Sequence, residues 1–207
     1  MPQLKLFDSS ETLLADDGRG RIIYTPHLID AATAEGWFAE LRSGVSWRTE
    51  RRMMYDREVD VPRLMAHVRL DPAPPLTPAP ILDAAARVVG ATAVPFNTVG
   101  LNLYRDGRDS VAPHHDHLNE IRQGFPIALV SLGATRRMII RASSHPRSVI
   151  NVDLEAGSLL LMDYATQLHY THGVPKTTEP VGERISLAFR VKPTRAPSED
   201  SAGGVYR

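Results

Sequence analysis

Five of the eight histidines lie in two short segments, which makes these segments the first candidates for chemistry. In the first segment, an extended backbone would put His114 and Asp116 on the same side of the chain, so that an imidazole and a carboxylate could share one metal ion. A third ligand must come from elsewhere, and His172 in the second segment is the best candidate. Two histidines and one carboxylate on one face would leave three coordination positions open, as in non-haem Fe(II) sites.

The same histidines are open to other interpretations. His115 and His117 form a second pair with the same spacing, which would suit a cupin-like site or a zinc hydrolase, because three histidines also bind zinc. A solvated loop would contain the same residues, since a His-x-Asp pattern arises easily by chance. We expect His115 to point away from the metal. We also expect His169 to pack nearby without binding the metal, because a fourth ligand would block an open position.

A row of polar residues near the C-terminus could bind a small acid. Alternation over residues 184–191 puts Arg184, Ser186 and Arg190 on one face and apolar side chains on the other. An edge strand with its polar face in water would explain this pattern. If the polar face instead lines the interior of a barrel, the two arginines would need an anionic partner such as a dicarboxylate. Asn102 and Tyr104 have the same spacing and offer further hydrogen-bond donors to a carboxylate.

These residues must be positioned by a framework that is mainly β-structure. The helical spacing of apolar residues predicts one helix from its N-cap Asp30 to Leu41, and a second helix from Ile81 to Val89 that ends near Gly90. Short segments separated by turn residues predict strands at 21–24, 98–104, 127–132, 137–141, 148–152, 158–162 and 184–191. We therefore expect an α-rich N-terminal layer packed on a β-sandwich or barrel.

Composition excludes several classes of protein. The 207 residues are 43% hydrophobic and can form a core, and the lack of cysteine excludes disulfide scaffolds, thiolate zinc sites and cysteine nucleophiles. The lack of a long apolar run and of a signal-like N-terminus favours a cytoplasmic protein without a membrane partner. With 24 basic and 24 acidic residues, any binding of nucleic acid would depend on a local basic patch. We predict one domain over 1–192, a proline-rich surface connection over 71–80 and a disordered tail over 193–207.

Taken together, the order and spacing of the polar motifs resemble the AlkB family of 2-oxoglutarate- and Fe(II)-dependent dioxygenases. The motifs that carry the resemblance are Asn102-x-Tyr104, His114-x-Asp116, His172 and Arg184-x5-Arg190. The resemblance extends over residues 20–192, and the joint order of the motifs is more specific than any one of them. Residues 53–59, followed by Pro62 and Arg63, resemble the nucleotide-recognition lid of the family. We place this lid at about residues 45–70 and the β core at about residues 96–192.

The resemblance implies a double-stranded β-helix (jelly-roll) core in which His114, Asp116 and His172 bind Fe(II). With O2 and 2-oxoglutarate as co-substrates, the implied reaction is the oxidative demethylation of N-alkylated nucleobases, such as 1-methyladenine and 3-methylcytosine, in DNA. The base would be in a single strand or flipped out of a duplex, at a cost of a few kcal/mol. We expect a monomer.

The resemblance also implies how 2-oxoglutarate is held. Arg184 and Tyr104 would bind its distal carboxylate, and Asn102 and Arg190 would bind the carboxylate that chelates iron. Ser186 stands at a position of the co-substrate site where relatives often have asparagine. We expect this difference to lower the affinity for the co-substrate to some extent.

The lid segment would contact the substrate. Residues 45–70 contain six arginines and four acidic residues, a net charge of about +2, so we expect weak and strongly salt-dependent binding of nucleic acid. Its aromatic and basic side chains suit stacking on a base and contacts with phosphates. The candidate substrate-binding residues are Trp47, Met54, Tyr55, Arg57 and His117. A solvated, mixed-charge loop with Met and Trp side chains packed into the core would contain the same residues.

The residues after Asp116 differ from the family pattern. Relatives that repair DNA commonly have an acidic pair there, whereas this chain has His117, Leu118 and Asn119. His117 could contact the substrate or lie beside the metal ligands. RNA, a protein side chain or a small molecule are therefore alternative substrates for the same chemistry. A jelly-roll binding module with a structural zinc and no catalysis is the alternative outside the enzymes.

Overall fold

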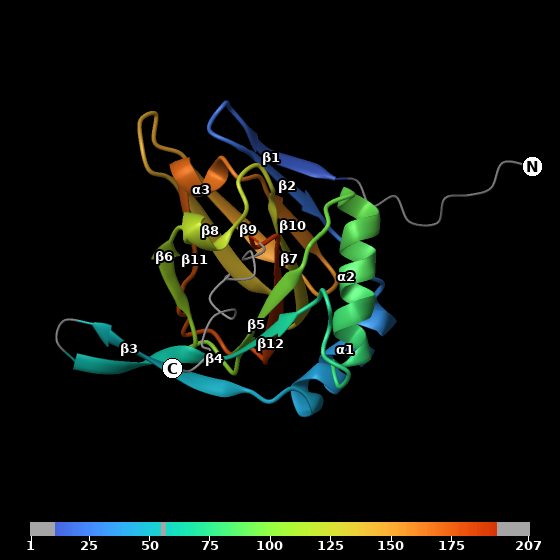
Figure 1. Cartoon of the computed structure of the whole chain (residues 1–207). Helices are drawn as coiled ribbons and strands as arrows, with labels where there is room; N and C mark the ends of the chain where they lie inside the picture. Colours follow the sequence, from blue (N-terminus) through green and yellow to red (C-terminus); the bar gives the residue numbers. More distant parts are fainter. Residues whose placement is uncertain (1–10, 55–56, 194–207) are drawn as a thin grey trace, which may run out of the picture.

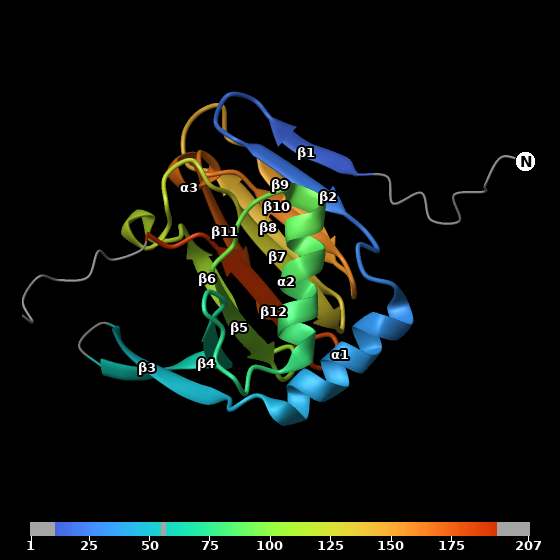
Figure 2. The ribbon, with the colours of Figure 1, turned by 45° about the vertical axis from the view of Figure 1, so that its right-hand side comes forward.

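The computed structural model describes residues 11–54 and 57–193, and for 52–54 and 57–59 it describes the backbone alone. The strands form two sheets that pack against each other, and the two long helices lie over the outer face of the larger sheet (Figures 1 and 2). The predicted tail lies outside the described residues from 194 onward. In the described part of the chain, no helix is long and apolar enough to cross a membrane.

The larger sheet contains eight strands and the smaller sheet four. In spatial order, the strands of the larger sheet are β1 (Thr12–Asp16), β2 (Arg21–Thr25), β10 (Leu159–Met162), β7 (Ile127–Gly133), β12 (Arg184–Arg190), β5 (Thr98–Tyr104), β4 (Arg57–Arg69) and β3 (Arg48–Met54). Those of the smaller sheet are β6 (Val111–His114), β11 (Tyr170–Val174), β8 (Arg136–Ala142) and β9 (Val149–Leu154). All described strand pairs are antiparallel. The architecture is the mainly β, jelly-roll type that the sequence predicts.

The first helix, α1 (Ala31–Gly44), begins where the sequence indicates. The Asp30 side chain accepts a hydrogen bond from the backbone N–H of Thr33 at 2.9 Å, which satisfies a donor that the helix itself leaves unpaired. Leu41 is fully buried, so the predicted apolar stripe is the face that packs on the sheet. The helix continues about one turn beyond its predicted end.

The second helix, α2 (Ala79–Thr92), does not end at Gly90 as predicted. It continues to Ala93, which adopts a φ of 56° and ends the helix with a left-handed residue. The buried side chain of Val88 anchors this last stretch in the core between the helices and the larger sheet. Such packing outweighs the cost of about 1 kcal/mol that an interior glycine adds.

Strand β12 separates two hydrophobic cores. Ile185, Leu187 and Phe189 point into the core under the helices, whereas the alternate residues, Ala188 among them, face the smaller sheet. The strand lies between β5 and β7 in the middle of the larger sheet, and Arg184 to Phe189 are all buried. The edge-strand explanation of its polar face is therefore wrong. The polar residues of β12 line the interior of the jelly roll.

The predicted lid segment forms a hairpin of strands β3 and β4, which the sequence patterns did not predict. Figure 1 shows the far end of this hairpin extending beyond the other strands, while residues Leu64 to Arg69 of β4 pair with β5. Strands β1, β6 and β11 are further strands that the patterns missed. In β3 a run of charged residues hides the alternation, and β6 and β11 are only four and five residues long.

Candidate metal and co-substrate site

Two neighbouring strands of the smaller sheet bring His114 and His172 together. His114 ends β6, His172 lies within β11, and the two residues are direct partners in the antiparallel pair. Their imidazole centroids are 4.4 Å apart. Asp116 follows β6, and its Oδ1 lies 3.6 Å from Nε2 of His114 and 3.8 Å from Nε2 of His172. The three ligand atoms lie within 4.8 Å of one another and form a group that can hold one metal ion.

The protonation states suit a divalent cation. Burial and the neighbouring His114 lower the pKa of His172 to about 3, so its imidazole is neutral and has a free lone pair. Burial alone would raise the pKa of Asp116, but His114 and the positive charge of Arg190 outweigh it and lower that pKa below its ordinary value. Nδ1 of His114 lies 3.0 Å from the carbonyl oxygen of Ala112, which can only accept a hydrogen bond. When Nδ1 carries the proton it can donate to this carbonyl, and Nε2 can then bind a metal ion.

Three contacts hold the segment that carries Asp116. The Nε of Arg190 donates to Oδ2 of Asp116 at 2.6 Å. The backbone N–H of Asp116 donates to the side-chain oxygen of Gln167 at 3.0 Å, and Nδ1 of His115 lies 3.0 Å from the carbonyl oxygen of Tyr170. His115 is thus engaged away from the group of three, as expected.

The other histidines do not join the metal-binding group. His117 is exposed at the start of the short 3-10 helix η1 (Leu118–Glu120), and His169 ends the short helix α3 (Thr166–His169). Among the described residues, the group of three potential ligands contains neither of them. The alternative site built on His115 and His117 has no third ligand in this part of the chain.

A second polar cluster lies deep inside the jelly roll. Arg184 is 1% exposed, and its Nη2 donates to Oγ of Ser131 at 2.8 Å. Its guanidinium lies 5.1 Å from the centre of the Tyr104 ring, which comes from the register partner of Arg184 on β5. Nε and Nη1 of Arg184 have no hydrogen-bond partner among the described residues. Burial lowers the pKa of this guanidinium, and a bound carboxylate would supply the missing charge and acceptors.

The remaining predicted co-substrate residues lie on the same inner face. Ser186 is buried between Ser131 and Asn102 in the strand register. Asn102 accepts a hydrogen bond from Nε of Arg63 at 2.8 Å, while Arg190 contacts Asp116. The structure thus places all five predicted residues on the inner face of β5 and β12, with Asn102 and Arg190 bonded to protein partners.

Sequence analysis missed several residues of this interior. Ser131 lies at an inward position of β7, where alternation could have found it. Arg136 is 3% exposed and donates hydrogen bonds to three backbone carbonyls, and its guanidinium lies 5.6 Å from the Tyr104 ring centre. Arg63 falls within the motif that resembles the lid, but that pattern assigns it no role. Gln167 comes from a short corner between strands and had no signal in the sequence.

The structure describes the side chains of only some of the residues that were predicted to contact the substrate. Trp47 packs against the core under the helices, and its indole N–H donates to the carbonyl of Arg42 at 3.2 Å. The structure therefore does not bring Trp47 to the metal group, and its packing agrees with the alternative of a tryptophan in the core. Tyr55 lies outside the described residues. Met54 and Arg57 lie at the facing ends of β3 and β4, where the backbone alone is described.

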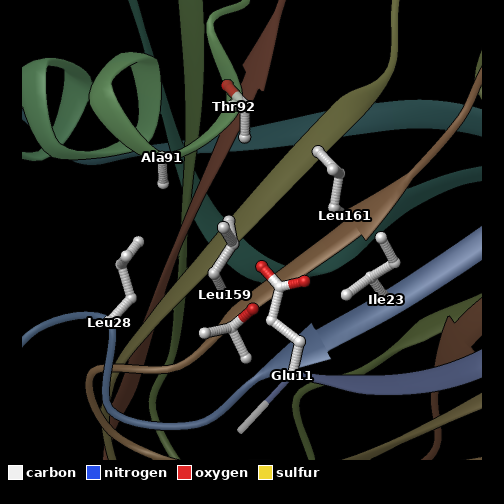
Figure 3. Close-up of a pocket in the computed structure, with 8 residues that line it drawn as sticks. Glu11, Ile23, Leu28, Ala91, Thr92, Leu159 and Leu161 are labelled. Atoms are coloured by element: carbon white, nitrogen blue, oxygen red, sulfur yellow. The ribbon is translucent and has the colours of Figure 1, made fainter. Parts of the chain in front are cut away.

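A separate hollow lies beside the end of α2 (Figure 3). It has a volume of about 240 Å³ and lies over strands β2 and β10. The residues that line it are Glu11, Ile23, Thr25, Leu28, Ala91, Thr92, Leu159 and Leu161. None of the predicted site residues contributes to it, so this hollow is distinct from the metal group.

Comparison with known proteins agrees with this geometry. The model of the 2OG-Fe(II) oxygenase superfamily matches residues 21–190. DNA oxidative demethylase ALKBH2 of Bos taurus is 32% identical over 186 residues, which cover 79% of this chain and 66% of that protein. Alpha-ketoglutarate-dependent dioxygenase alkB homolog 3 of Rattus norvegicus is 29% identical over 213 residues, covering 93% and 72%. A prolyl-4-hydroxylase structure from Pseudomonas putida superposes with a TM-score of 0.57 at 14% identity, over 83% of this chain and 93% of that one, which supports the fold.

The fold and the His-Asp-His group thus define a 2-oxoglutarate-dependent non-haem iron oxygenase. The chain belongs to the 2OG-Fe(II) oxygenase superfamily and, within it, to the AlkB-like dioxygenases. Its cofactors are Fe(II), 2-oxoglutarate and O2. The donor set fits this assignment, because two imidazoles and one carboxylate suit Fe(II) and the unsatisfied Arg184 guanidinium suits a carboxylate.

Proposed function

We propose that this protein oxidatively demethylates N-alkylated nucleobases, such as 1-methyladenine and 3-methylcytosine, in DNA. The observation that carries the proposal is the pairing of two sites inside one jelly roll. One is a group of three metal ligands, and the other is a buried arginine with two unsatisfied nitrogen atoms. The relatives whose printed names describe DNA oxidative demethylases support the choice of substrate class.

The metal group binds Fe(II) through Nε2 of His114, a carboxylate oxygen of Asp116 and Nε2 of His172. When bound, Fe(II) with 2-oxoglutarate and O2 supplies the oxidant for the N-methyl group. Arg190 keeps Asp116 ionised, and it holds the carboxylate oxygen that faces away from the two histidines. The protein therefore offers a preformed anionic ligand in Asp116 and a neutral imidazole in His172.

The buried cluster binds the distal carboxylate of 2-oxoglutarate. Nε and Nη1 of Arg184 donate to this carboxylate, and the Tyr104 hydroxyl is a further donor. Ser131 accepts a hydrogen bond from Nη2 and so keeps the guanidinium oriented. Asn102 and Arg190 bind the carboxylate nearer the metal. Because these two side chains are bonded to Arg63 and Asp116, they are already oriented before the co-substrate arrives.

The substrate base approaches from the side of His114. The His114 side chain is 42% exposed, whereas Asp116 and His172 are 9% and 8% exposed. His117 is exposed next to this opening and can contact the base. A base must leave its duplex stack to reach a site at this depth, so the substrate is single-stranded or flipped.

The test is a mass-spectrometric assay at low salt. Protein loaded with Fe(II) under anaerobic conditions is mixed with 2-oxoglutarate, O2 and single-stranded oligonucleotides that carry 1-methyladenine or 3-methylcytosine. The expected result is loss of the methyl group with an equal amount of succinate. Succinate without demethylation would overturn the substrate and favour RNA, a protein side chain or a small molecule. Neither product, with the metal shown to be bound, would overturn the enzymatic proposal and favour a binding module.

A further inference from the structure

Gln167 contacts the metal-binding segment from a buried position. It lies in α3, which joins β10 to β11, and it is 3% exposed. Its side-chain oxygen accepts the backbone N–H of Asp116 at 3.0 Å, and its side-chain nitrogen donates to Oγ1 of Thr166 at 2.9 Å. Both ends of this amide are thus used inside the protein, which fixes the direction in which the oxygen points.

The helix that carries Gln167 is itself firmly attached. Oγ1 of Thr166 donates to the carbonyl of Asp163 at 2.7 Å, and the N–H of Thr166 donates to Oδ1 of Asp163 at 3.1 Å. The turn between β1 and β2 packs directly on this corner at Gly20, where a Cβ would come within 2.6 Å of Cγ2 of Thr166. A larger residue than glycine would not fit there, so the position of Gln167 depends on this close contact.

Asp116 depends on such contacts because no regular element holds it. Residues 115–117 lie between β6 and η1 without helix or strand structure. Arg190 holds the carboxylate, but under the proposed function the same guanidinium also serves the co-substrate. Gln167 binds the backbone N–H of Asp116 and not its carboxylate, so it can hold the residue in place whether or not Arg190 binds the co-substrate.

We propose that Gln167 is a positioning residue that holds Asp116 in the geometry required for Fe(II). This inference rests on the proposed metal site. Removal of such a partner of a metal ligand commonly costs about 10- to 100-fold in metal affinity. A purely structural role would instead lower the stability of the protein equally with and without metal.

The experiment compares Gln167→Met with wild type. Methionine has a similar length and lacks the acceptor. Gln123→Met, at an exposed position, is the matched control for the same chemical change. Binding of Mn²⁺ to metal-free protein is followed by the electron paramagnetic resonance signal of the free ion. Thermal unfolding is recorded with and without Mn²⁺, because a ligand that binds the folded state raises the unfolding temperature.

The expected result is a Kd for Mn²⁺ that rises about 10- to 100-fold in Gln167→Met, a smaller metal-induced rise in unfolding temperature, and wild-type values in Gln123→Met. Unchanged affinity in Gln167→Met would overturn the inference. Wild-type protein that binds no Mn²⁺ would overturn the metal site itself. If Gln167→Met does not fold, Thr166→Val is used, because it removes the hydroxyl that orients Gln167. Its affinity should fall by a smaller factor, and unchanged affinity would again contradict the inference.

Discussion

The two ends of the candidate site differ in their access to solvent. At the metal end, the His114 side chain is 42% exposed. At the co-substrate end, Arg184 is 1% exposed and two of its nitrogen atoms lack a partner. A buried, charged side chain suits one small anion of fixed size, whereas an exposed end can accept part of a large molecule. Under the proposed function, the buried end is the co-substrate site and the exposed end is the reaction site.

The largest effect is expected from Asp116→Ala at the metal end. The variant loses the carboxylate ligand and leaves Arg190 without its anionic partner. We expect turnover of 2-oxoglutarate to fall to background, as measured by succinate formation. Asp153→Ala removes an exposed carboxylate that pairs with Arg137, and it should keep wild-type turnover. Normal turnover in Asp116→Ala would exclude this residue as a ligand.

At the buried co-substrate end, Arg184→Met should weaken the binding of 2-oxoglutarate and stabilise the free protein. Loss of hydrogen bonds to a charged group should raise the Kd for 2-oxoglutarate roughly 10- to 150-fold, since such bonds contribute about 1.5–3 kcal/mol. The free energy of unfolding without co-substrate should rise by about 1–3 kcal/mol, because an unpaired buried charge has been removed. Calorimetric titration and urea unfolding measure the two quantities. Arg137→Met on the surface should change neither much, and a variant that binds 2-oxoglutarate normally would remove Arg184 from the co-substrate site.

Ser131→Ala should have an intermediate effect at the same end. It removes the partner of Nη2 of Arg184, so the free energy of unfolding should fall by about 1–3 kcal/mol, the cost of leaving a buried donor unsatisfied. The affinity for 2-oxoglutarate should fall as well, because the guanidinium is less well oriented. The exposed Ser46→Ala serves as the control for both measurements. A gain in stability would show that Ser131 does not orient Arg184.

The smallest effect is expected on the outer surface, from Arg48→Gln in strand β3. Arg48 is exposed on the hairpin that extends beyond the sheets. If it contacts a phosphate, the plot of log binding constant against log salt concentration should become less steep, with a slope smaller in magnitude by about 1. The KM for 2-oxoglutarate should not change. Arg87→Gln, on the exposed side of α2, should leave the slope as it is. An unchanged slope in Arg48→Gln would place the nucleic acid elsewhere.

Strand β12 shows how far sequence alone can reach. Period-two alternation correctly separated Ile185, Leu187 and Phe189 from the polar residues between them. It could not decide which face meets water, because an edge strand and a central strand covered on both sides share this pattern. That choice depends on β5 and β7, which pair with β12 from distant parts of the chain.

The hairpin of β3 and β4 shows the opposite case. Its charged residues alternate with no clear period, so local pattern did not indicate strands. The strands exist because β4 pairs with β5 over Leu64 to Arg69, and β3 in turn pairs with β4. Trp47, predicted to contact the substrate, directly precedes β3 and packs against the core under the helices.

By itself, the sequence determined the residue types and spacings of the site: His114 and Asp116 two apart, with Arg184 and Arg190 on one face of a strand. These are local properties, since the backbone period decides which neighbours share a side. The sequence indicated His172 as the third ligand, and the tertiary structure showed how it meets His114 across two strands. Only the tertiary structure showed that Ser131 contacts Arg184 and that Gln167 reaches the backbone of Asp116. Such contacts join residues far apart in the chain, and they form because most polar groups that are buried in a shared core need a hydrogen-bond partner.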